Sequence, residues 1–137
     1  GIKTLGLRMR QHEASTRKLV QWLQSRSDIE NIFYPGLDQH PGHHIASRQA
    51  RGYGGMFSFD VGSGERAERV LSRTRYFILA ESLGAVESLI SVPARMTHAS
   101  IPPERRRELG ITDGLIRISV GVEDVADLQE DLEQALR

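Results

Sequence analysis

The chain has 137 residues, a length that suits a single domain with one hydrophobic core. Lysine plus arginine and aspartate plus glutamate each number 18, so the formal net charge is zero, which argues against a nucleic-acid binder or a membrane-surface protein. The sequence has no cysteine, which excludes disulfides, thiol catalysis and thiolate metal sites and is compatible with a reducing compartment. No apolar run approaches the roughly 20 residues of a membrane-spanning helix.

Hydrophobic periodicity divides the first half of the chain into four elements. Apolar side chains three or four residues apart predict a helix over residues 5–26, and a short strand follows over residues 29–34. A loop bracketed by two Pro-Gly pairs leads into a short helix over residues 43–51. Glycines end that helix and introduce a strand over residues 56–61, whose aromatic side chains share one face.

The second half mixes helices and short strands in the same way. An amphipathic helix is predicted over residues 65–74, a strand over 76–79, a short charged helix over 104–109, a strand over 115–120 and a closing helix over 124–136. Regular βαβ crossovers do not separate the strands. The pattern therefore predicts an α+β fold, in which helices pack on one face of a small, mainly antiparallel sheet.

The strand over residues 115–120 alternates strictly between apolar and polar side chains. Ile116, Ile118 and Val120 share one face, and Arg117 and Ser119 share the other. An arginine opposite the apolar face is well placed to bind a carboxylate or phosphate that arrives from outside this domain.

Two other hydroxyl residues complete a candidate anion site with Arg117. Ser82 lies in a Ser/Gly-rich turn, where backbone N–H groups can face an anion, and Thr97 supplies a second side-chain hydroxyl. The alternative is that Arg117 forms a structural ion pair, and the residue pattern leaves both interpretations open.

Two further patterns favour structural roles. The histidines at positions 40, 43 and 44 have a spacing that a metal site can use, but the Pro-Gly pair between them indicates a loop, and we expect no metal there. Residues 51–59 imitate an RNA-binding motif, but Gly55 and Ser58 occupy positions where stacking aromatic rings belong. We therefore predict a helix end and a turn that lead into a strand with its aromatic face in the core.

The remaining charged residues have simple interpretations. Residues 104–108 form a solvated helix face with internal charge pairs. Glu81, Glu87 and Glu123 have no partner at a spacing typical of paired acid–base groups, and Glu123 is interpreted as a helix-start residue.

Several motifs, in one order, resemble a known enzyme family. They are YGGMFSF at 53–59, LAESLG at 79–84, VESLI at 86–90, PA at 93–94, MTHAS at 96–100 and IRISVGVED at 116–124. The chain is similar over its whole length to the C-terminal domain of the Cys/Met-metabolism enzymes, the fold-type I pyridoxal-phosphate (PLP) enzymes that include cystathionine γ-synthase and γ-lyase.

The resemblance implies roles for individual residues. Arg117 binds the substrate α-carboxylate, and Ser82, through its backbone, and Thr97 line the same pocket. Glu81 influences substrate choice. Ser91 stands where γ-lyases of the animal type tend to carry an acidic residue, and it therefore favours a γ-synthase or a homoserine-ester sulfhydrylase.

The resemblance also implies a larger protein around this chain. Residues 1–137 form one substrate-binding domain of a longer enzyme, and residues 1–27 contain the helix that links it to an upstream cofactor domain. The resemblance implies that this upstream domain carries the Schiff-base lysine and binds PLP, and the only lysines here, Lys3 and Lys18, lie in the opening helix. We expect no catalytic residue in this chain, an inactive fragment, a homotetrameric, cytoplasmic full-length enzyme, and neither nucleic acid nor membrane as a partner.

The expected activity is that of a cystathionine γ-synthase-like enzyme, which performs γ-replacement or γ-elimination on homoserine esters or cystathionine. Cystathionine γ-lyase, methionine γ-lyase and homoserine-ester sulfhydrylase are alternatives within the family. The alternative from another class is a free-standing α+β module that binds a small carboxylate or a partner protein without chemistry.

Overall fold

A five-stranded sheet organises the chain, and the computed structural model describes all residues 1–137. Its strand order is β1-β2-β5-β4-β3. All neighbouring strands are antiparallel except β3 and β4, which are parallel. The strands are β1 (Asn31–Phe33), β2 (Met56–Asp60), β3 (Ile78–Leu79), β4 (Leu89–Ser91) and β5 (Leu115–Ser119).

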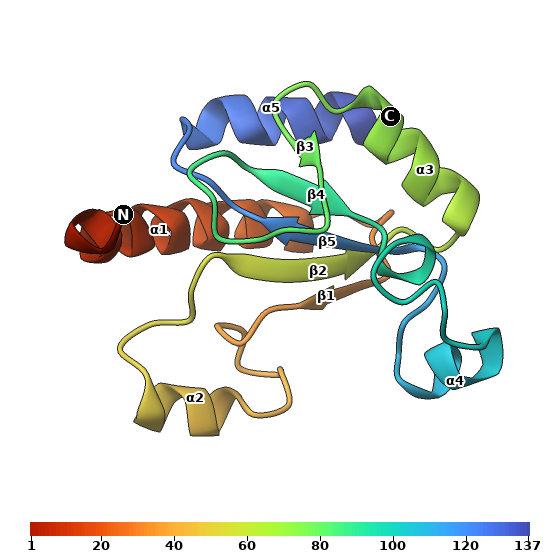
Figure 1. Ribbon diagram of the computed structural model, residues 1–137, viewed down its shortest axis with the longest axis horizontal. Helices are drawn as coiled ribbons and strands as arrows, with labels where there is room; N and C mark the ends of the chain where they lie inside the picture. The colour runs from red at the N-terminus through yellow and green to blue at the C-terminus, as the bar shows by residue number, and fades with distance from the viewer.

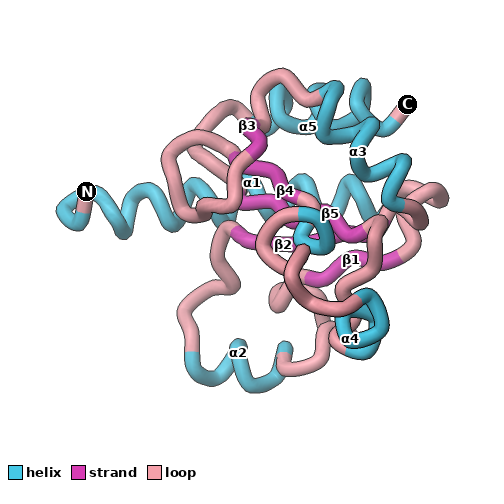
Figure 2. Tube along the Cα trace, turned by 45° about the vertical axis from the view of Figure 1, so that its right-hand side comes forward, coloured by secondary structure: helices cyan, strands magenta, loops and turns pink.

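Three helices cover one face of this sheet (Figure 1). They are α1 (Leu5–Gln24), α3 (Gly64–Arg73) and α5 (Val125–Leu136). The short elements are η1 (Ile2–Thr4), α2 (His43–Gln49), η2 (Pro93–Arg95) and α4 (Pro103–Glu108). Helices α2 and α4 stand apart from the sheet and its covering helices (Figure 2). The predicted α+β fold with a mainly antiparallel sheet and helices on one face is thus confirmed, and no helix is both long and apolar enough to cross a membrane.

The pairing of β2 with β5 forms the centre of the core. Phe57 lies opposite Ile118 and Phe59 opposite Ile116, and all four side chains are buried. The predicted aromatic face of the 56–61 segment therefore enters the core, where it contributes apolar burial and does not offer stacking surfaces to bases.

The structure corrects several predicted strand boundaries. The strand expected over 29–34 is only Asn31–Phe33, and the one expected over 76–79 is only Ile78–Leu79. Strand Leu89–Ser91 was not predicted, because all three of its side chains are buried and no alternation marks it. Its extended form depends on its neighbours, since it pairs with β3 on one side and β5 on the other.

The apolar stripe of α1 is only partly used in this fold. Leu19 and Leu23 are fully buried, but Leu5 and Met9, which continue the same stripe, remain 44% and 40% exposed. The N-terminal part of the helix extends beyond the sheet (Figure 2), so its apolar side chains contact little of this chain.

Asp131 of α5 fixes the segment that enters β3. Its carboxylate is buried and accepts hydrogen bonds from the backbone N–H groups of Arg75, Tyr76 and Phe77. These donors have no strand partner of their own, so one side chain satisfies a whole turn of backbone.

We expect Asp131→Ala to destabilise the chain by about 3 kcal/mol, because three backbone N–H groups lose a buried carboxylate acceptor. Urea unfolding followed by Trp22 fluorescence measures the change. Glu130→Ala, at the exposed neighbouring position, serves as the control and should cost less than about 0.5 kcal/mol. Equal losses in the two variants would contradict this role for Asp131.

A second polar contact joins the ends of three helices. Arg66 of α3 donates to the carboxylate and to the backbone carbonyl of Asp28, and also reaches the carbonyl of Leu136. The hydrogen bond from Arg26 and that from Arg66 lower the pKa of Asp28, although partial burial opposes this shift. The ionised form of Asp28 is therefore favoured in the folded chain.

This shift predicts a pH dependence of stability. Because the folded-state pKa of Asp28 lies below its ordinary value of 3.8, its contribution is complete above that value and is lost as the pH falls through the folded-state pKa. Asp28→Asn should flatten the acid limb of a plot of unfolding free energy against pH, whereas Glu130→Gln should not. An unchanged acid limb in Asp28→Asn would argue against this assignment.

Candidate functional site

Arg117 lies on the face of β5 that the helices do not cover. Its cross-strand neighbours are Ser58 on β2 and Ser91 on β4. The half-buried guanidinium donates from Nη2 to the backbone carbonyl of Glu81 at 2.8 Å, and it forms no ion pair with any carboxylate of the chain. The structural ion pair considered above is therefore not present within this chain, where Nε and Nη1 also have no partner.

Residues 80–88 connect β3 to β4 in an unusual way. Parallel neighbouring strands normally need a crossover of about a dozen residues or more, usually through a helix. Here the 80–88 segment passes over β5 before it returns into β4 (Figure 1). It runs along β5 in the same direction, because Glu81 meets Arg117, Gly84 meets Ser119 and, further on, Ser88 meets Glu123.

The attachment of this segment brings the Glu81 carbonyl to Arg117. Glu81, whose carbonyl accepts from Arg117, immediately precedes Ser82, and the backbone N–H of Ser82 has no acceptor within the chain. The side chains of Glu81 and Ser82 are both exposed. Gly84 has a φ of +76°, and its N–H already donates to the Ser119 hydroxyl, so this turn N–H does not face outward.

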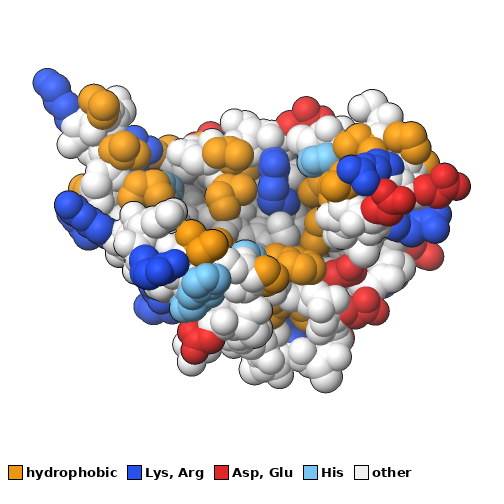
Figure 3. All heavy atoms as spheres, turned by 90° about the horizontal axis from the view of Figure 1, so that it is seen from below, with side chains coloured by type: hydrophobic (Ala, Val, Ile, Leu, Met, Phe, Trp, Pro, Cys, Tyr) orange, Lys and Arg blue, Asp and Glu red, His pale blue; other side chains and the backbone are white.

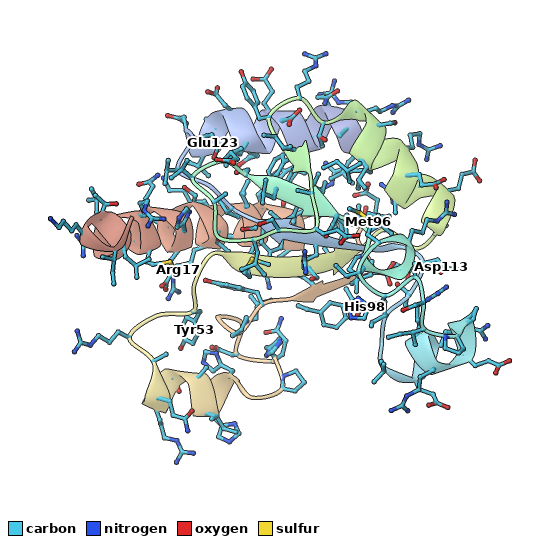
Figure 4. The ribbon with its side chains drawn as sticks, in the orientation of Figure 1. Arg17, Tyr53, Met96, His98, Asp113 and Glu123 are labelled. Atoms are coloured by element: carbon cyan, nitrogen blue, oxygen red, sulfur yellow. The ribbon has the colours of Figure 1, made fainter.

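Ser91 and Thr97 belong to a different segment, which runs from β4 through η2. Thr97 follows η2, which packs against β5, and its hydroxyl is 2.7 Å from Nδ1 of His98. No hydrogen bond joins Thr97 to Arg117 or Ser82. Ser91 is opposite Arg117, only 1% exposed, and its hydroxyl has no hydrogen-bond partner. Figure 4 shows Met96 and His98 on the side of the molecule where α4 lies.

Glu123 does not start the last helix, as its sequence position suggested. Asp124 caps α5, since its side chain accepts from the N–H of Ala126 at 2.8 Å. Glu123 instead accepts from the N–H and hydroxyl of Ser88, at 2.7 and 2.9 Å, so the helix-start interpretation was wrong (Figure 4). Sequence analysis missed this contact because Ser88 is far away in the chain and no local spacing marks the pair.

The histidine loop is held by structural contacts. His43 has one ring nitrogen 2.7 Å from the Pro35 carbonyl and the other 3.3 Å from the Asp38 carboxylate, and its ring stacks on Tyr53. No group of three or more His, Cys, Asp or Glu side chains is arranged to hold a metal ion.

Tyr53 joins this loop to α1. The Arg17 guanidinium lies 5.1 Å from the Tyr53 ring centre (Figure 4) and pairs with Glu13. Burial alone would raise the pKa of Glu13, but hydrogen bonds from Arg17 and from the N–H groups of Tyr53 and Gly54 outweigh it and lower the pKa.

The charged helix and the open surface complete the site's surroundings. In α4, Arg105 pairs with Glu108 at 2.7 Å, which confirms the predicted internal charge pairing. Seen from below, the surface is hollowed between the α2 side and the α4 side, and cationic and histidine side chains border the hollow (Figure 3).

Comparison with known proteins identifies the family. The family described as "Cys/Met metabolism PLP-dependent enzyme" matches residues 1–137. The chain belongs to this family. Similar curated proteins are the cystathionine γ-lyase of Bacillus subtilis (61% identical), the cystathionine β-lyase of Lactococcus lactis (52%) and the cystathionine γ-synthase of Mycobacterium tuberculosis (51%). Each match covers 99% of this chain, but only 36%, 36% and 34% of the relative.

A solved member of the family has the same fold. The crystal structure of cystathionine γ-lyase from Lactobacillus plantarum, complexed with L-serine, superposes with a TM-score of 0.93 at 44% identity and covers 98% of this chain. This chain corresponds to 35% of that protein. It therefore spans about a third of the length of its Cys/Met-family relatives.

The residues of this chain do not fit the covalent attachment of PLP. The only lysines are Lys3 in η1 and Lys18 in α1, and both are exposed. Neither lysine belongs to β5, to the 80–88 segment or to the turn that carries Thr97. The elements around Arg117 therefore contain no lysine.

Proposed function

We propose that this chain is the C-terminal, substrate-binding domain of a PLP-dependent transsulfuration enzyme. The observation that carries the proposal is Arg117, whose guanidinium is half-buried on the open face of β5 and lacks a carboxylate partner. Membership of the Cys/Met family supports it, as do relatives named for cystathionine lyases and a cystathionine synthase.

Arg117 is proposed to bind the α-carboxylate of an amino-acid substrate. The unpartnered Nε and Nη1 add donors to Nη2, and a planar fork of this kind pairs with the two oxygens of a carboxylate. Ser82, whose backbone N–H has no acceptor within the chain, and Thr97 are proposed to line the same pocket. The Ser82 N–H shares a trans peptide with the Glu81 carbonyl, so it points away from the Arg117 guanidinium in this structure.

The contribution of these residues to the reaction is orientation. When the carboxylate is fixed, rotation of the amino acid is restricted, and its Cα–H bond is held at a defined angle to the reacting group. PLP, when bound by the rest of the enzyme, supplies the electron sink for the carbanion formed at Cα.

Two residues near Arg117 are proposed to influence substrate choice. The exposed Glu81 side chain presents a negative charge beside the carboxylate site. Ser91, directly opposite Arg117 on β4, is a small neutral side chain at a position where an acid would add a second negative charge.

The finer reaction class is proposed to be that of a cystathionine γ-synthase, on the strength of Ser91. The relatives span γ-lyase, β-lyase and γ-synthase at 61%, 52% and 51% identity, and γ-lyase is therefore the main alternative. Two assays of the full-length enzyme separate them. Cystathionine formed from a homoserine ester and cysteine supports the synthase, and release of cysteine from cystathionine alone supports the lyase.

The remaining features of the proposal concern the whole protein. We propose that an upstream domain binds PLP, that the opening helix joins the two domains, and that the enzyme is a cytoplasmic homotetramer. The exposed apolar side chains at the N-terminal end of α1 support a further packing partner for this helix.

Arg117→Ala in the full-length enzyme tests the assigned role. We expect the variant to lose about 2–5 kcal/mol of substrate binding or transition-state stabilisation, measured as kcat/KM, because a desolvated carboxylate contact is removed. Arg107→Ala, an exposed arginine of α4 without an ion pair, is the matched control and should behave as the parent. Near-normal kinetics of Arg117→Ala would refute the proposed role of Arg117.

Borohydride reduction with PLP tests the division between the two domains. The isolated 15.4 kDa chain should keep its mass, whereas the full-length enzyme should gain one phosphopyridoxyl group. Intact-mass spectrometry gives the answer. A reduced, site-specific adduct on the isolated chain would overturn the assignment and favour a lysine of this chain as the attachment point.

A further inference from the structure

Residues at and after the end of β5 hold the middle and the far end of the 80–88 segment. Gly84 N–H donates to the Ser119 hydroxyl at 2.8 Å, Val122 N–H donates to the Val86 carbonyl at 2.8 Å, and Ser88 donates twice to Glu123. None of these groups contacts the guanidinium of Arg117, yet the segment carries the Glu81 carbonyl that Arg117 binds.

The contact between Ser119 and Gly84 lies closest to Arg117. Ser119 and Arg117 are two residues apart in β5 and therefore share one face. The same strand thus presents both the guanidinium and the hydroxyl that holds the 80–88 segment. Ser119 is 3% exposed, and Gly84 needs its φ of +76° to turn its N–H toward that hydroxyl.

The contact at Glu123 fixes the other end of the segment. The Ser88 hydroxyl donates to Glu123 and accepts from Gly121 N–H at 2.8 Å, and Ser88 is fully buried. At Gly121 a Cβ would lie 2.3 Å from both the Val86 carbonyl oxygen and a Glu123 carboxylate oxygen. The backbone after β5 is therefore packed directly against the segment, with no room for a side chain between them.

We propose that Ser119 and Glu123 are positioning residues for substrate recognition. By fixing Gly84 and Ser88 they hold the 80–88 segment over β5, and this keeps the Glu81 carbonyl on the Arg117 guanidinium, which orients its free Nε and Nη1 donors. They touch no substrate and act through the segment. This inference rests on the proposed role of Arg117 as the carboxylate anchor.

The consequence is a specific change in binding. Without the Ser119 hydroxyl, the segment loses the fixed point that follows Glu81, while the core side of β5 is unaltered, since Ile116 and Ile118 pack on the opposite face. The Glu81 carbonyl then holds the Arg117 guanidinium less firmly, which weakens substrate binding and leaves the chemistry at Cα unchanged.

The experiment is a double-mutant cycle in the full-length enzyme, with KM and kcat measured for its amino-acid substrate. Ser119→Ala should raise KM about fivefold, the value of one hydrogen bond of ordinary strength, with kcat nearly unchanged. In the Arg117→Ala background the same substitution should raise KM less than about twofold, because the two act on one carboxylate contact. Ser72→Ala, the same change on the exposed side of α3, is the control.

Each outcome is decisive. An unchanged KM in Ser119→Ala, or an equal increase with and without Arg117, would overturn the positioning role and indicate general loosening of the fold. If Ser119→Ala does not yield folded enzyme, Glu123→Gln replaces it in the same cycle, with the same expected direction and the same overturning result. The single variant Arg117→Ala tests the carboxylate anchor. If its kinetics are normal, the proposed function itself is refuted. If Arg117→Ala is impaired but Ser119→Ala is normal, only this inference is refuted.

Discussion

The alternation of side chains along β5 is the constraint on which the rest of the structure depends. Because successive residues of a strand point to opposite faces, Ile116 and Ile118 enter the core while Arg117 and Ser119 face away from it. A slip of one residue would bury the guanidinium and expose both isoleucines. This change is unfavourable because apolar surface would enter water and a charged group would lose its hydration. The hydrophobic effect thus fixes the direction of Arg117 without any contact to its head group.

The other elements add precision to this arrangement. Strand β2 pairs with β5 over five residues and matches phenylalanines to isoleucines, so the register of the central pair is set by aromatic and β-branched packing. The 80–88 segment then lies along the polar face, held by hydrogen bonds whose partners come from β5 and the turn after it. Residues 115–123 consequently supply core side chains, the Arg117 guanidinium and the groups that hold the 80–88 segment.

The chain keeps a clear separation between its structural charges and the cation on its open face. Arg66 binds Asp28, and Arg17 binds Glu13, each with nearby backbone carbonyl or N–H groups as further partners. Asp131 is satisfied by three backbone donors. Among these groups, only Arg117 faces the open side of the sheet and meets a carbonyl without any carboxylate partner. This contrast makes the site recognisable by physical reasoning as well as by family membership.

The sequence by itself determined the periodic elements, the division of β5 into two faces, the burial of the 56–61 strand and the family, because each depends on local spacing or on ordered motifs. It placed Arg117 correctly opposite the apolar face. Only the tertiary structure decided that β4 is a strand, that Glu123 binds Ser88 instead of starting a helix, and that Ser119 holds Gly84. The physical reason is that these features are hydrogen bonds between residues 35 apart in the chain, or strand pairing without alternation, and neither leaves a periodic trace in the sequence.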